Sequence, residues 1–471
     1  MLAWEPGAVA VAEGVATVII GLGLLQQLLH LAQLGVAGSV LMKEHVGAAD
    51  QLWRRFADAA PPISLLVPGY NEELSIVQSV RSLLSLQYPA FEVVVINDGS
   101  KDRMLDALKE AFDLVETERF YDTPCPHRPI RAIYTSPTQA RLVVVDKENG
   151  GKADALNAGL NVSRAPVVCS MDADSLLESD ALLRACRPFI DEPEKTIAVG
   201  GTIRIVNGCR VRGGRVVEVR APRRTLPLIQ TVEYLRAFLM ARLAWSRIAC
   251  LMVISGAFGL FSRAAVMEVG GYSLGTVGED MELIVKLHRK AREEKRDYRI
   301  GFVPEPVCWT EAPETVEVLA RQRARWQRGT LETFAKHRDM LFNPRYGRVG
   351  LLGMGHVLLT DVLGPVIEVV GYFLVPILWL LGILSIEYML AFIAVTFALG
   401  VVVSVGALAL EEMELRRFPK ARDLWLLFLA AIVENFGYRQ LSNFWRLRGV
   451  YQWLRKSHGW GEMTRTGFAK R

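Results

Sequence analysis

The ten residues "ISLLVPGYNE" (Ile63–Glu72) join a short apolar run to a polar turn. A run of this length, rich in apolar side chains and closed by turn residues, predicts a buried β-strand. The segment that follows, "SIVQSVRSLLSL", has apolar side chains at helical spacing. A strand followed at once by a helix is the repeating unit of α/β folds, so this stretch sets the expected fold class.

The same alternation continues along the chain, in "FEVVVINDGS" (91–100) with a helix at 102–117, in "LVVVD" (142–146) with "GGKADALNAGL", and in "APVVCSMDADS" (165–175). Continuous apolar strands alternating with helices predict a mostly parallel sheet covered by helices on both faces. Ligands bind beyond the carboxyl ends of such strands. Five polar residues fall at those ends, which predicts a ligand site there: Asn71, Glu72, Asp98, Asp172 and Asp174.

Composition divides the chain into a membrane part and a soluble part. Of its 471 residues, 51% are hydrophobic, yet 22% are charged, which is too many for a bundle of spanning helices alone. The net charge of +5 comes from 55 basic and 50 acidic residues, a balance that argues against a nucleic-acid binder. The six cysteines form no C-x-x-C pair, so we expect reduced thiols rather than a disulfide framework or a zinc site.

The first apolar run, residues 8–42, is longer than the roughly 20 residues that span a bilayer. It lacks the basic start and cleavage site of a signal peptide. Basic residues follow it, so the positive-inside rule places the chain from residue 50 onward in the cytoplasm. Further runs lie at 350–384, 388–410 and 424–441.

The last of these runs holds Glu434, Asn435 and Arg439, which are better satisfied inside a helix bundle or a polar channel than against lipid. The basic tail is expected to be cytoplasmic, but three crossings after residue 345 would put it outside. The number of crossings therefore stays open. The expected parts are a transmembrane helix and linker (1–60), a cytoplasmic domain (61–335), interfacial and transmembrane helices (336–445) and a basic tail (446–471).

Several residues at the strand ends suit a nucleotide and a metal ion, although each has a plainer explanation. Asp172 and Asp174 can converge on a hard divalent cation, or close the strand in an Asx turn. Asp98 could accept hydrogen bonds from a ribose or a base, or belong to a turn. Tyr70 could stack on a nucleobase. Lys152, after two glycines, could meet the charge of a diphosphate, or be a solvated lysine at a helix start.

Glu279 and Asp280 follow a glycine-rich loop and open a predicted helix. Acids at that position are favoured by the helix dipole. Alternatively, one of them is a base that deprotonates an incoming hydroxyl. The segment "SGAFGLF" (255–261), which begins with Ser255 and Gly256, would form a turn packed under such a site.

Taken in this order, the motifs closely resemble family 2 membrane glycosyltransferases with a GT-A fold, the group that includes poly-N-acetylglucosamine, hyaluronan, chitin and cellulose synthases. The resemblance covers about 61–335, and this part of the chain is most similar to the poly-N-acetylglucosamine branch. The chain departs from the family at Asn97, where Asn97-Asp98 replaces the usual pair of aspartates, and at Gly69, inside the P-x-Y-N-E motif (68–72). The resemblance implies the following site residues: for UDP, Pro68, Tyr70, Glu72, Asp98 and Asp172; for Mg²⁺ or Mn²⁺, Asp172 and Asp174; for catalysis, Asp280 with Glu279, and Arg325; for the acceptor, Gln322 and Trp326. From their own positions in the sequence, Lys152 is added to the UDP-binding residues, and Ser255 and Gly256 to the acceptor-binding residues.

"RQRARWQRG" (321–329) carries the Q-x-x-R-W motif of this family. Arg325 is expected to stabilise the negative charge of the departing UDP. Trp326 offers a flat apolar face to the acceptor sugar and would hold its hydroxyl within the roughly 3–3.5 Å needed for attack. The neighbouring Arg321, Arg323 and Arg328 are expected to face solvent or lipid headgroups.

The resemblance implies a metal-dependent inverting hexosyltransferase of exopolysaccharide biosynthesis. It would transfer a sugar from UDP-N-acetylglucosamine or UDP-glucose to the end of a growing β-linked polysaccharide, coupled to passage of the product through the membrane. The alternative is addition of a single sugar to a lipid of the polyprenyl phosphate or ceramide type. The implied location is a bacterial-type plasma membrane with the catalytic domain in the cytoplasm, and an accessory export subunit is a candidate partner. A transporter or receptor that only binds nucleotide is a weaker reading, because the set of acids is complete for chemistry.

Overall fold

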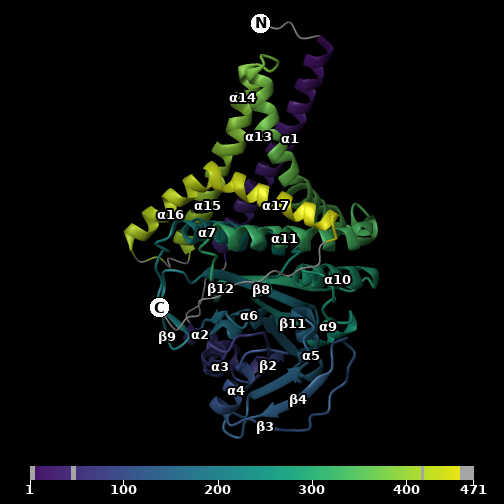
Figure 1. Cartoon of the computed structure of the whole chain (residues 1–471), viewed down its shortest axis with the longest axis vertical. Helices are drawn as coiled ribbons and strands as arrows, with labels where there is room; N and C mark the ends of the chain where they lie inside the picture. The colour runs from purple at the N-terminus through teal and green to yellow at the C-terminus, as the bar shows by residue number, and fades with distance from the viewer. Residues whose placement is uncertain (1–5, 44–48, 415–417, 419, 457–471) are drawn as a thin grey trace.

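The computed structural model describes residues 6–43, 49–414, 418 and 420–456. A domain built on a β-sheet forms the lower part of Figure 1, a layer of helices crosses above it, and long helices rise from that layer to the N-terminal end. The sheet domain and the long apolar helices thus correspond to the soluble part and the membrane part that composition predicts.

The described residues form one ten-stranded sheet, in the order β3-β4-β5-β2-β1-β6-β11-β8-β12-β7. The strand pairings make seven of these ten strands run in the same direction, whereas β4, β7 and β11 run against them. The expected mostly parallel α/β fold is therefore confirmed. The bounds are β1(Ile63–Gly69), β2(Phe91–Asp98), β3(Val115–Glu116), β4(Ile130–Thr135), β5(Leu142–Lys147), β6(Val167–Met171), β7(Leu176–Leu177), β8(Thr196–Ile205), β11(Phe258–Ser262) and β12(Arg299–Thr310).

Helices cover the sheet because its central strands are apolar on both faces. Leu65, Leu66 and Val67 of β1 are fully buried, as are Val94 and Val95 of β2, which follows from their position in the middle of a parallel sheet. The helices of this domain are α2(Ala49–Phe56), α3(Ile76–Leu84), α4(Met104–Phe112), α5(Lys152–Val162), α6(Ala181–Asp191), α9(Arg263–Glu268) and α10(Glu279–Glu293).

The Gly- and Arg-rich stretch 207–224, which the sequence indicates is a loop or an insertion, contains a small hairpin of β9(Arg210–Arg212) and β10(Arg215–Glu218). Its turn is held by the Ser82 hydroxyl of α3, which donates to the carbonyl of Gly214 at 2.9 Å. Alternation of arginine and valine gives these short strands, and glycines at positive φ give the turn.

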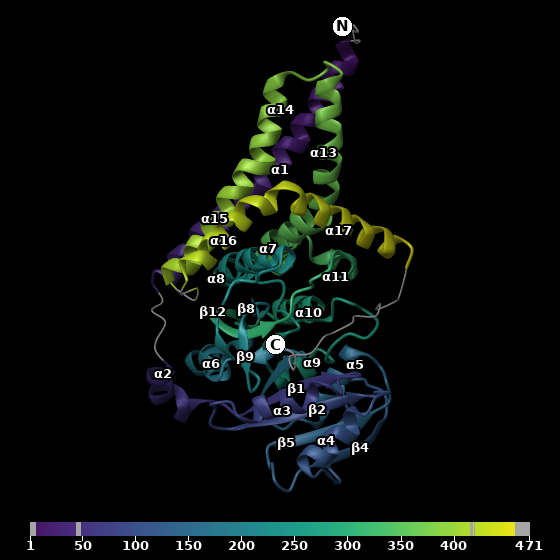
Figure 2. The same ribbon diagram turned by 60° about the vertical axis from the view of Figure 1, so that its left-hand side comes forward.

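Three helical stretches are long and apolar enough to cross a membrane: Pro6–Leu41, Val349–Leu380 and Ile386–Met413. The first is α1(Pro6–Leu41). The second ends in α13(Gly364–Leu380), and the third comprises α14(Ile386–Ile393), η7(Ala394–Ala398) and α15(Leu399–Glu414). α13 and α14 lie side by side in both views, joined at the top of the molecule (Figures 1 and 2). The two later stretches therefore form a hairpin that returns the chain to the side of the sheet domain.

The apolar run 424–441 is not among the candidate spans found in the described part of the chain. It consists of α16(Ala421–Val433) and η8(Glu434–Tyr438), followed by α17(Arg439–Leu454), and Phe436 and Gly437 are non-helical at the junction. α17 packs along α11(Val316–Lys336) instead of rising with α13 (Figure 1). Two candidate spans after residue 345 are compatible with the expected cytoplasmic tail, which stays a prediction; the tail beyond residue 456 lies outside the described residues.

Candidate active site

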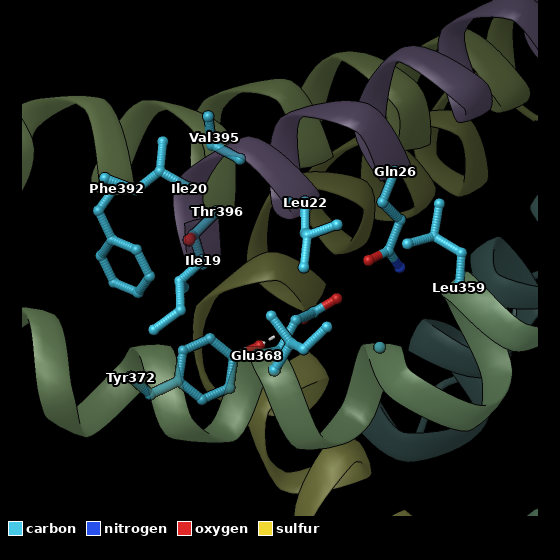
Figure 3. A pocket seen from close by; sticks show the side chains of 13 residues that line it. Ile19, Ile20, Leu22, Gln26, Leu359, Glu368, Tyr372, Phe392, Val395 and Thr396 are labelled. Atoms are coloured by element: carbon cyan, nitrogen blue, oxygen red, sulfur yellow. Dashed lines mark hydrogen bonds between the residues drawn. The ribbon is translucent and has the colours of Figure 1, made fainter. Parts of the chain in front are cut away.

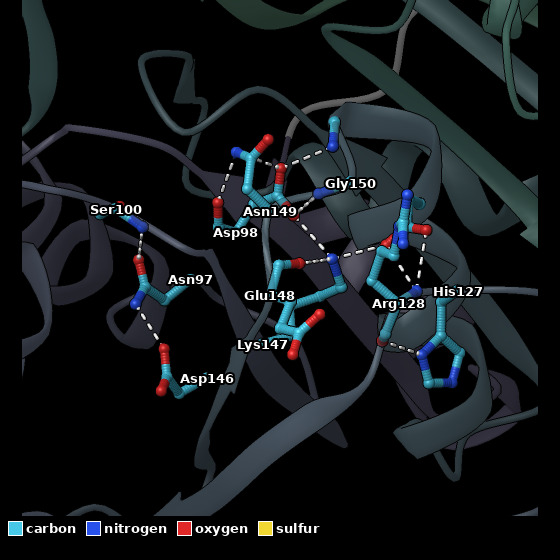
Figure 4. Close-up of polar contacts among 12 residues, drawn as sticks. Asn97, Asp98, Ser100, His127, Arg128, Asp146, Lys147, Glu148, Asn149 and Gly150 are labelled. Carbon is cyan, nitrogen blue, oxygen red and sulfur yellow. Dashed lines mark hydrogen bonds and ion pairs between the residues drawn. The ribbon is translucent and has the colours of Figure 1, made fainter.

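The loop that precedes α5 is built around the carboxylate of Asp98 (Figure 4). Asp98 ends β2 and is 4% exposed. Its Oδ1 accepts hydrogen bonds from Lys147 Nζ at 2.7 Å and the Gly150 amide at 3.0 Å. Its Oδ2 accepts from the Gly151 amide at 2.8 Å and Asn149 Nδ2 at 3.2 Å. Both oxygens are thus engaged by the chain's own groups, so Asp98 holds the loop in place.

Lys147 is a buried cation between two carboxylates. Its side chain is fully buried, and its Nζ lies 2.7 Å from Asp98 and 2.5 Å from Asp154. The Arg128 amide also donates to the two carboxylate oxygens of Asp154, at 3.1 Å to Oδ1 and 2.9 Å to Oδ2. Two acids offset the cost of burying one ammonium, so this trio fastens β2, β5 and α5 to one another. Lys147 is not predicted from the sequence, because a lysine at a strand end is ordinarily solvated.

Lys152, the first residue of α5, reaches into a cluster of acids. Its Nζ lies 2.5 Å from Asp172 Oδ1, 3.8 Å from Glu279 and 3.3 Å from the carbonyl of Gly256. Burial lowers the pKa of Lys152, but the charges of Asp172 and Glu279 raise it by more, to above its ordinary value. The ammonium is therefore permanently charged at neutral pH.

Asp172 and Asp174 follow β6 and are both half-buried. Among the described residues no group of three or more His, Cys, Asp or Glu side chains could hold a metal ion by itself. Magnesium, however, is commonly bound by one or two carboxylates together with substrate phosphates and water. The donor set at this strand end therefore fits a divalent cation that is shared with a nucleotide diphosphate.

Glu279 and Asp280 open α10 in different surroundings. Asp280 Oδ2 accepts from the Gly256 amide at 3.0 Å, its Oδ1 accepts from the Met281 amide at 2.8 Å, and the side chain is partly accessible. Glu279 is 6% exposed, and burial, helped by Asp280 and opposed by Lys152, raises its pKa to about 7. Of the two, Asp280 is the carboxylate with the access that a substrate needs.

The helix that carries Trp326 is pressed against the start of α10. A Cβ atom on Gly329 of α11 would lie 2.8 Å from the Cα of Gly278, so only glycines allow this approach. Glu332 of α11 reinforces the contact by accepting from the Thr276 hydroxyl at 2.9 Å and the Val277 amide at 3.0 Å. The motif "RQRARWQRG" is thereby placed next to Glu279 and Asp280.

Within this motif, Trp326 is 44% exposed, and the guanidinium of Arg323 lies 4.4 Å from its ring centroid. Arg323 is 3% exposed and pairs with Glu233 at 2.6 Å, which raises the pKa of Arg323 despite its burial. Arg328 is equally buried. The expectation that Arg323 and Arg328 face solvent or headgroups is therefore wrong, because Arg323 pairs with Glu233 of another helix and Arg328 lies 3.6 Å from Glu332, one turn along α11. Arg321 is exposed, as expected.

The segment "PGYNE" (68–72) lies at the end of β1, beside the end of β2. Asn71, at φ 57°, receives a hydrogen bond from the Lys101 amide at 2.8 Å and donates one to Ser100 Oγ at 3.0 Å. This links the loop after β1 to the loop after β2 and leaves Tyr70 44% exposed. The remaining predicted residues of the site are half-buried: Pro68, Glu72, Ser255, Gln322 and Arg325.

A second cation near the candidate base was also missed. Arg242 places its guanidinium 3.7 Å from the ring centroid of Phe238, and its Nη1 is buried with no hydrogen-bond partner in the described part of the chain. Burial lowers the pKa of Arg242 to about 10, and the charge of Asp280 opposes this shift. Nothing in the surrounding apolar sequence distinguishes this arginine from an ordinary surface residue.

A polar cavity of about 220 Å³ lies among the helices above the site. π-Helical turns, which are frequent at functional sites, contribute to its wall: η2(Leu235–Arg242), η6(Val357–Leu363) and η8(Glu434–Tyr438). Three ion pairs lie within the wall, Arg236 with Glu434 at 2.7 Å, Arg439 with Glu368 at 3.0 Å and Arg446 with Asp361 at 3.1 Å.

Among the described residues, the buried lining atoms without a hydrogen-bond partner are Gln27 Oε1, both polar atoms of the Gln33 amide, His356 Nδ1 and one carboxylate oxygen, Glu434 Oε2. The amides and the imidazole suit a ligand that offers hydroxyl groups. α11 links this cavity to the acid cluster, because Gln327 donates to the Asp361 carbonyl at 2.6 Å and accepts from Arg446 at 2.7 Å.

An apolar cleft adjoins the polar cavity, nearer the N-terminal end of α1 (Figure 3). Gln26 and Glu368 line both spaces. The other side chains around the cleft are almost all hydrocarbon, among them Ile19, Leu22 and Phe392. Polar and apolar spaces therefore meet among helices that include the three candidate membrane spans.

Comparison with known proteins agrees with this architecture. Residues 167–405 match the family described as "Glycosyl transferase family group 2", and residues 64–234 match "Glycosyl transferase family 2". The chain belongs to this glycosyltransferase family, as the motifs predict.

Two curated relatives illustrate the likeness. The chain is 28% identical over 299 residues to the probable glycosyltransferase YdaM of Bacillus subtilis, a match that covers 63% of this chain and 62% of the relative. It is 30% identical over 274 residues to the poly-beta-1,6-N-acetyl-D-glucosamine synthase of Staphylococcus epidermidis, covering 58% of this chain and 56% of that one. The chain thus spans less than two thirds of the length of these curated relatives.

Among solved structures, the fold is similar to that of the mannosyltransferase PcManGT of Pyrobaculum calidifontis, in complex with GDP-Man and Mn²⁺. The TM-score is 0.50 at 18% identity, and the match covers 93% of this chain and 99% of that one. This likeness supports the expected GT-A fold with its helical additions.

Proposed function

We propose that the protein transfers a sugar from UDP-N-acetylglucosamine or UDP-glucose to the end of a growing β-linked polysaccharide, with inversion at the anomeric carbon. The observation that carries this proposal is the gathering of Lys152, Asp172, Glu279 and Asp280 around one point beyond the strand ends. Relatives named as poly-β-1,6-N-acetyl-D-glucosamine synthases support the choice of sugar and of a polymeric product.

In the proposed reaction the acceptor hydroxyl attacks the anomeric carbon as the bond from that carbon to the diphosphate oxygen breaks. Asp280 takes the hydroxyl proton, and UDP leaves with the bonding electron pair. Asp172 and Asp174 would hold Mg²⁺ or Mn²⁺, which supplies charge neutralisation at the diphosphate. Lys152 and Arg325 add fixed positive charge where negative charge grows.

Trp326 would seat the acceptor sugar on its exposed face, next to Asp280. Tyr70 is exposed at the adjoining strand end and would stack on the uracil. Asp98 would position the nucleotide indirectly, by holding the loop before α5, because its carboxylate oxygens already accept hydrogen bonds from Lys147, Gly150 and Gly151. Ser255, Gly256 and Gln322 complete the acceptor side.

Passage of the product through the membrane is part of the proposal. The polar cavity supports it, because its unpartnered groups include amides and an imidazole that can exchange hydrogen bonds with hydroxyls. The site would then face the cytoplasm, and α1 would bring the chain in from outside. An accessory export subunit would receive the product beyond the hairpin of α13 and α14.

A lipid acceptor is the second candidate, and the apolar cleft favours it. A hydrocarbon chain in the cleft would place its polar head in the cavity that shares Gln26 and Glu368. The product would then be one sugar on a polyprenyl phosphate or ceramide-type lipid.

Purified full-length protein, incubated with Mn²⁺ and each of a panel of radiolabelled nucleotide sugars, tests these proposals. UDP release with UDP-N-acetylglucosamine, together with label in long chains on a sizing gel, is the expected result. Label confined to a lipid extract would establish the second candidate instead. Release only from GDP-mannose would overturn the choice of donor.

A further inference from the structure

The ammonium of Lys152 and a divalent cation would compete for the carboxylate of Asp172. Lys152 Nζ donates to Asp172 Oδ1 at 2.5 Å, which is a short, charge-assisted hydrogen bond. Its two other neighbours are weaker, the Gly256 carbonyl at 3.3 Å and Glu279 at 3.8 Å. Asp172 is therefore the main anchor of this lysine.

The protein offers a cation little else at this position. Apart from Asp172 and Asp174, no group of acids, histidines or cysteines in the described ranges is arranged to complete a metal site. A bound cation would lie beside a permanently charged ammonium, and the two positive charges repel strongly where water is scarce. The half-buried position of Asp172 makes that repulsion costly.

We propose that Lys152 makes metal binding depend on the nucleotide: it holds Asp172 until a diphosphate arrives, then turns to the diphosphate and yields the carboxylate to the cation. This inference rests on the proposed function, since it assumes a diphosphate donor at the same site. A nucleotide diphosphate supplies phosphate oxygens as further ligands for the cation. It also supplies negative charge that replaces the Asp172 carboxylate beside the lysine.

The position of Lys152 permits this exchange. Its backbone is fixed at the start of α5 by the loop that Asp98 holds, so the lysine cannot leave the site. Its long side chain can still turn, because its other contacts are one carbonyl and one distant carboxylate. Linkage makes the effect reciprocal: the metal strengthens nucleotide binding by the factor by which the nucleotide strengthens metal binding.

Mn²⁺ binding to the purified full-length protein, followed by electron paramagnetic resonance with and without UDP, tests the inference. For the wild-type chain we expect UDP to tighten Mn²⁺ binding by about tenfold or more. Lys152→Met should bind Mn²⁺ without UDP more tightly than the wild type by a similar factor, and the gain from UDP should shrink. Lys152→Arg, which keeps the charge, should behave as the wild type does, and Lys152→Gln should reproduce Lys152→Met.

A matched control is Lys195→Met, because Lys195 forms an equally short pair with Asp297, at 2.5 Å, but on the surface. It should leave both affinities unchanged. The inference is overturned if Mn²⁺ binds the wild type equally well with and without UDP, or if neither Lys152→Met nor Lys152→Gln binds Mn²⁺ more tightly than the wild type in the absence of UDP. In both cases the proposed function would survive. Absence of Mn²⁺ binding to the wild type even with UDP would overturn the proposed metal site and this inference together.

Discussion

Replacing Asp98 with asparagine tests whether this residue builds the loop or only contacts the nucleotide. The change keeps the shape of the side chain but removes its charge and converts one acceptor into a donor. Lys147 then keeps only Asp154 as a charged partner, and one of the amides of Gly150 and Gly151 faces a like donor.

The expected loss of stability follows from these contacts. Breaking a buried ion pair from one side costs about 3–5 kcal/mol. Because Asp154 still offsets the charge of Lys147, we expect the lower end, about 3 kcal/mol. For a domain of this size, 1 kcal/mol shifts the midpoint of thermal unfolding by roughly 2–4 °C, so a fall of about 6–12 °C is expected.

The assay is thermal unfolding of the detergent-purified chain by tryptophan fluorescence, alongside UDP binding by calorimetry. The control is Asp297→Asn, which breaks an exposed pair with Lys195 and should cost less than about 1 kcal/mol. Asp98→Asn should lower both the unfolding midpoint and the affinity for UDP. An unchanged midpoint with lost UDP binding would refute the reasoning and return Asp98 to a direct contact with the uridine.

Three further changes probe other parts of the structure. Gly329→Val should destabilise the protein by about 1–3 kcal/mol and lower kcat, because the new side chain pushes α11 away from Gly278; wild-type unfolding and turnover would contradict the close contact. Burial raises the pKa of Glu279 from 4.5 to about 7, so the folded state binds this proton more tightly and stability falls as pH rises between those values. Glu279→Gln should gain on the order of 3 kcal/mol over the wild type between pH 4.5 and 8 in pH-dependent unfolding, and a constant difference would show that the carboxyl is not perturbed. Arg323→Met removes the charged partner of Glu233, leaving it the hydrogen bond from the Tyr438 hydroxyl, and should cost about 3 kcal/mol in denaturant unfolding; a neutral effect would place that pair in solvent.

Much of the sheet could be predicted because most of its strands are continuous apolar runs in the sequence. Buried parallel strands must be apolar on both faces, so runs such as "FEVVVIND" mark them directly, and the polar residues after each run then mark the edge where a ligand binds. The family resemblance rests on those same strand ends. Residues far apart in the chain, such as Asp98 and Asp172, were therefore assigned to one edge without coordinates.

What could not be predicted depends on partners distant in sequence. Lys147 is buried only because Asp98 and Asp154 lie beside it, and Arg323 only because Glu233 does. Hydropathy treats all such residues as exposed. The sequence also does not reveal the kink at Phe436 and Gly437, which divides the apolar run 424–441 into two helices.

Transfer by Asp280→Asn, measured on the same preparation as its UDP binding, tests the central claim most directly. Asparagine keeps the hydrogen bond from the Gly256 amide but cannot take a proton from the acceptor. We predict UDP affinity within a few-fold of the wild type and sugar transfer reduced by about 10²–10⁴-fold. Turnover close to that of the wild type would contradict the assignment of this acid cluster as the site of glycosyl transfer.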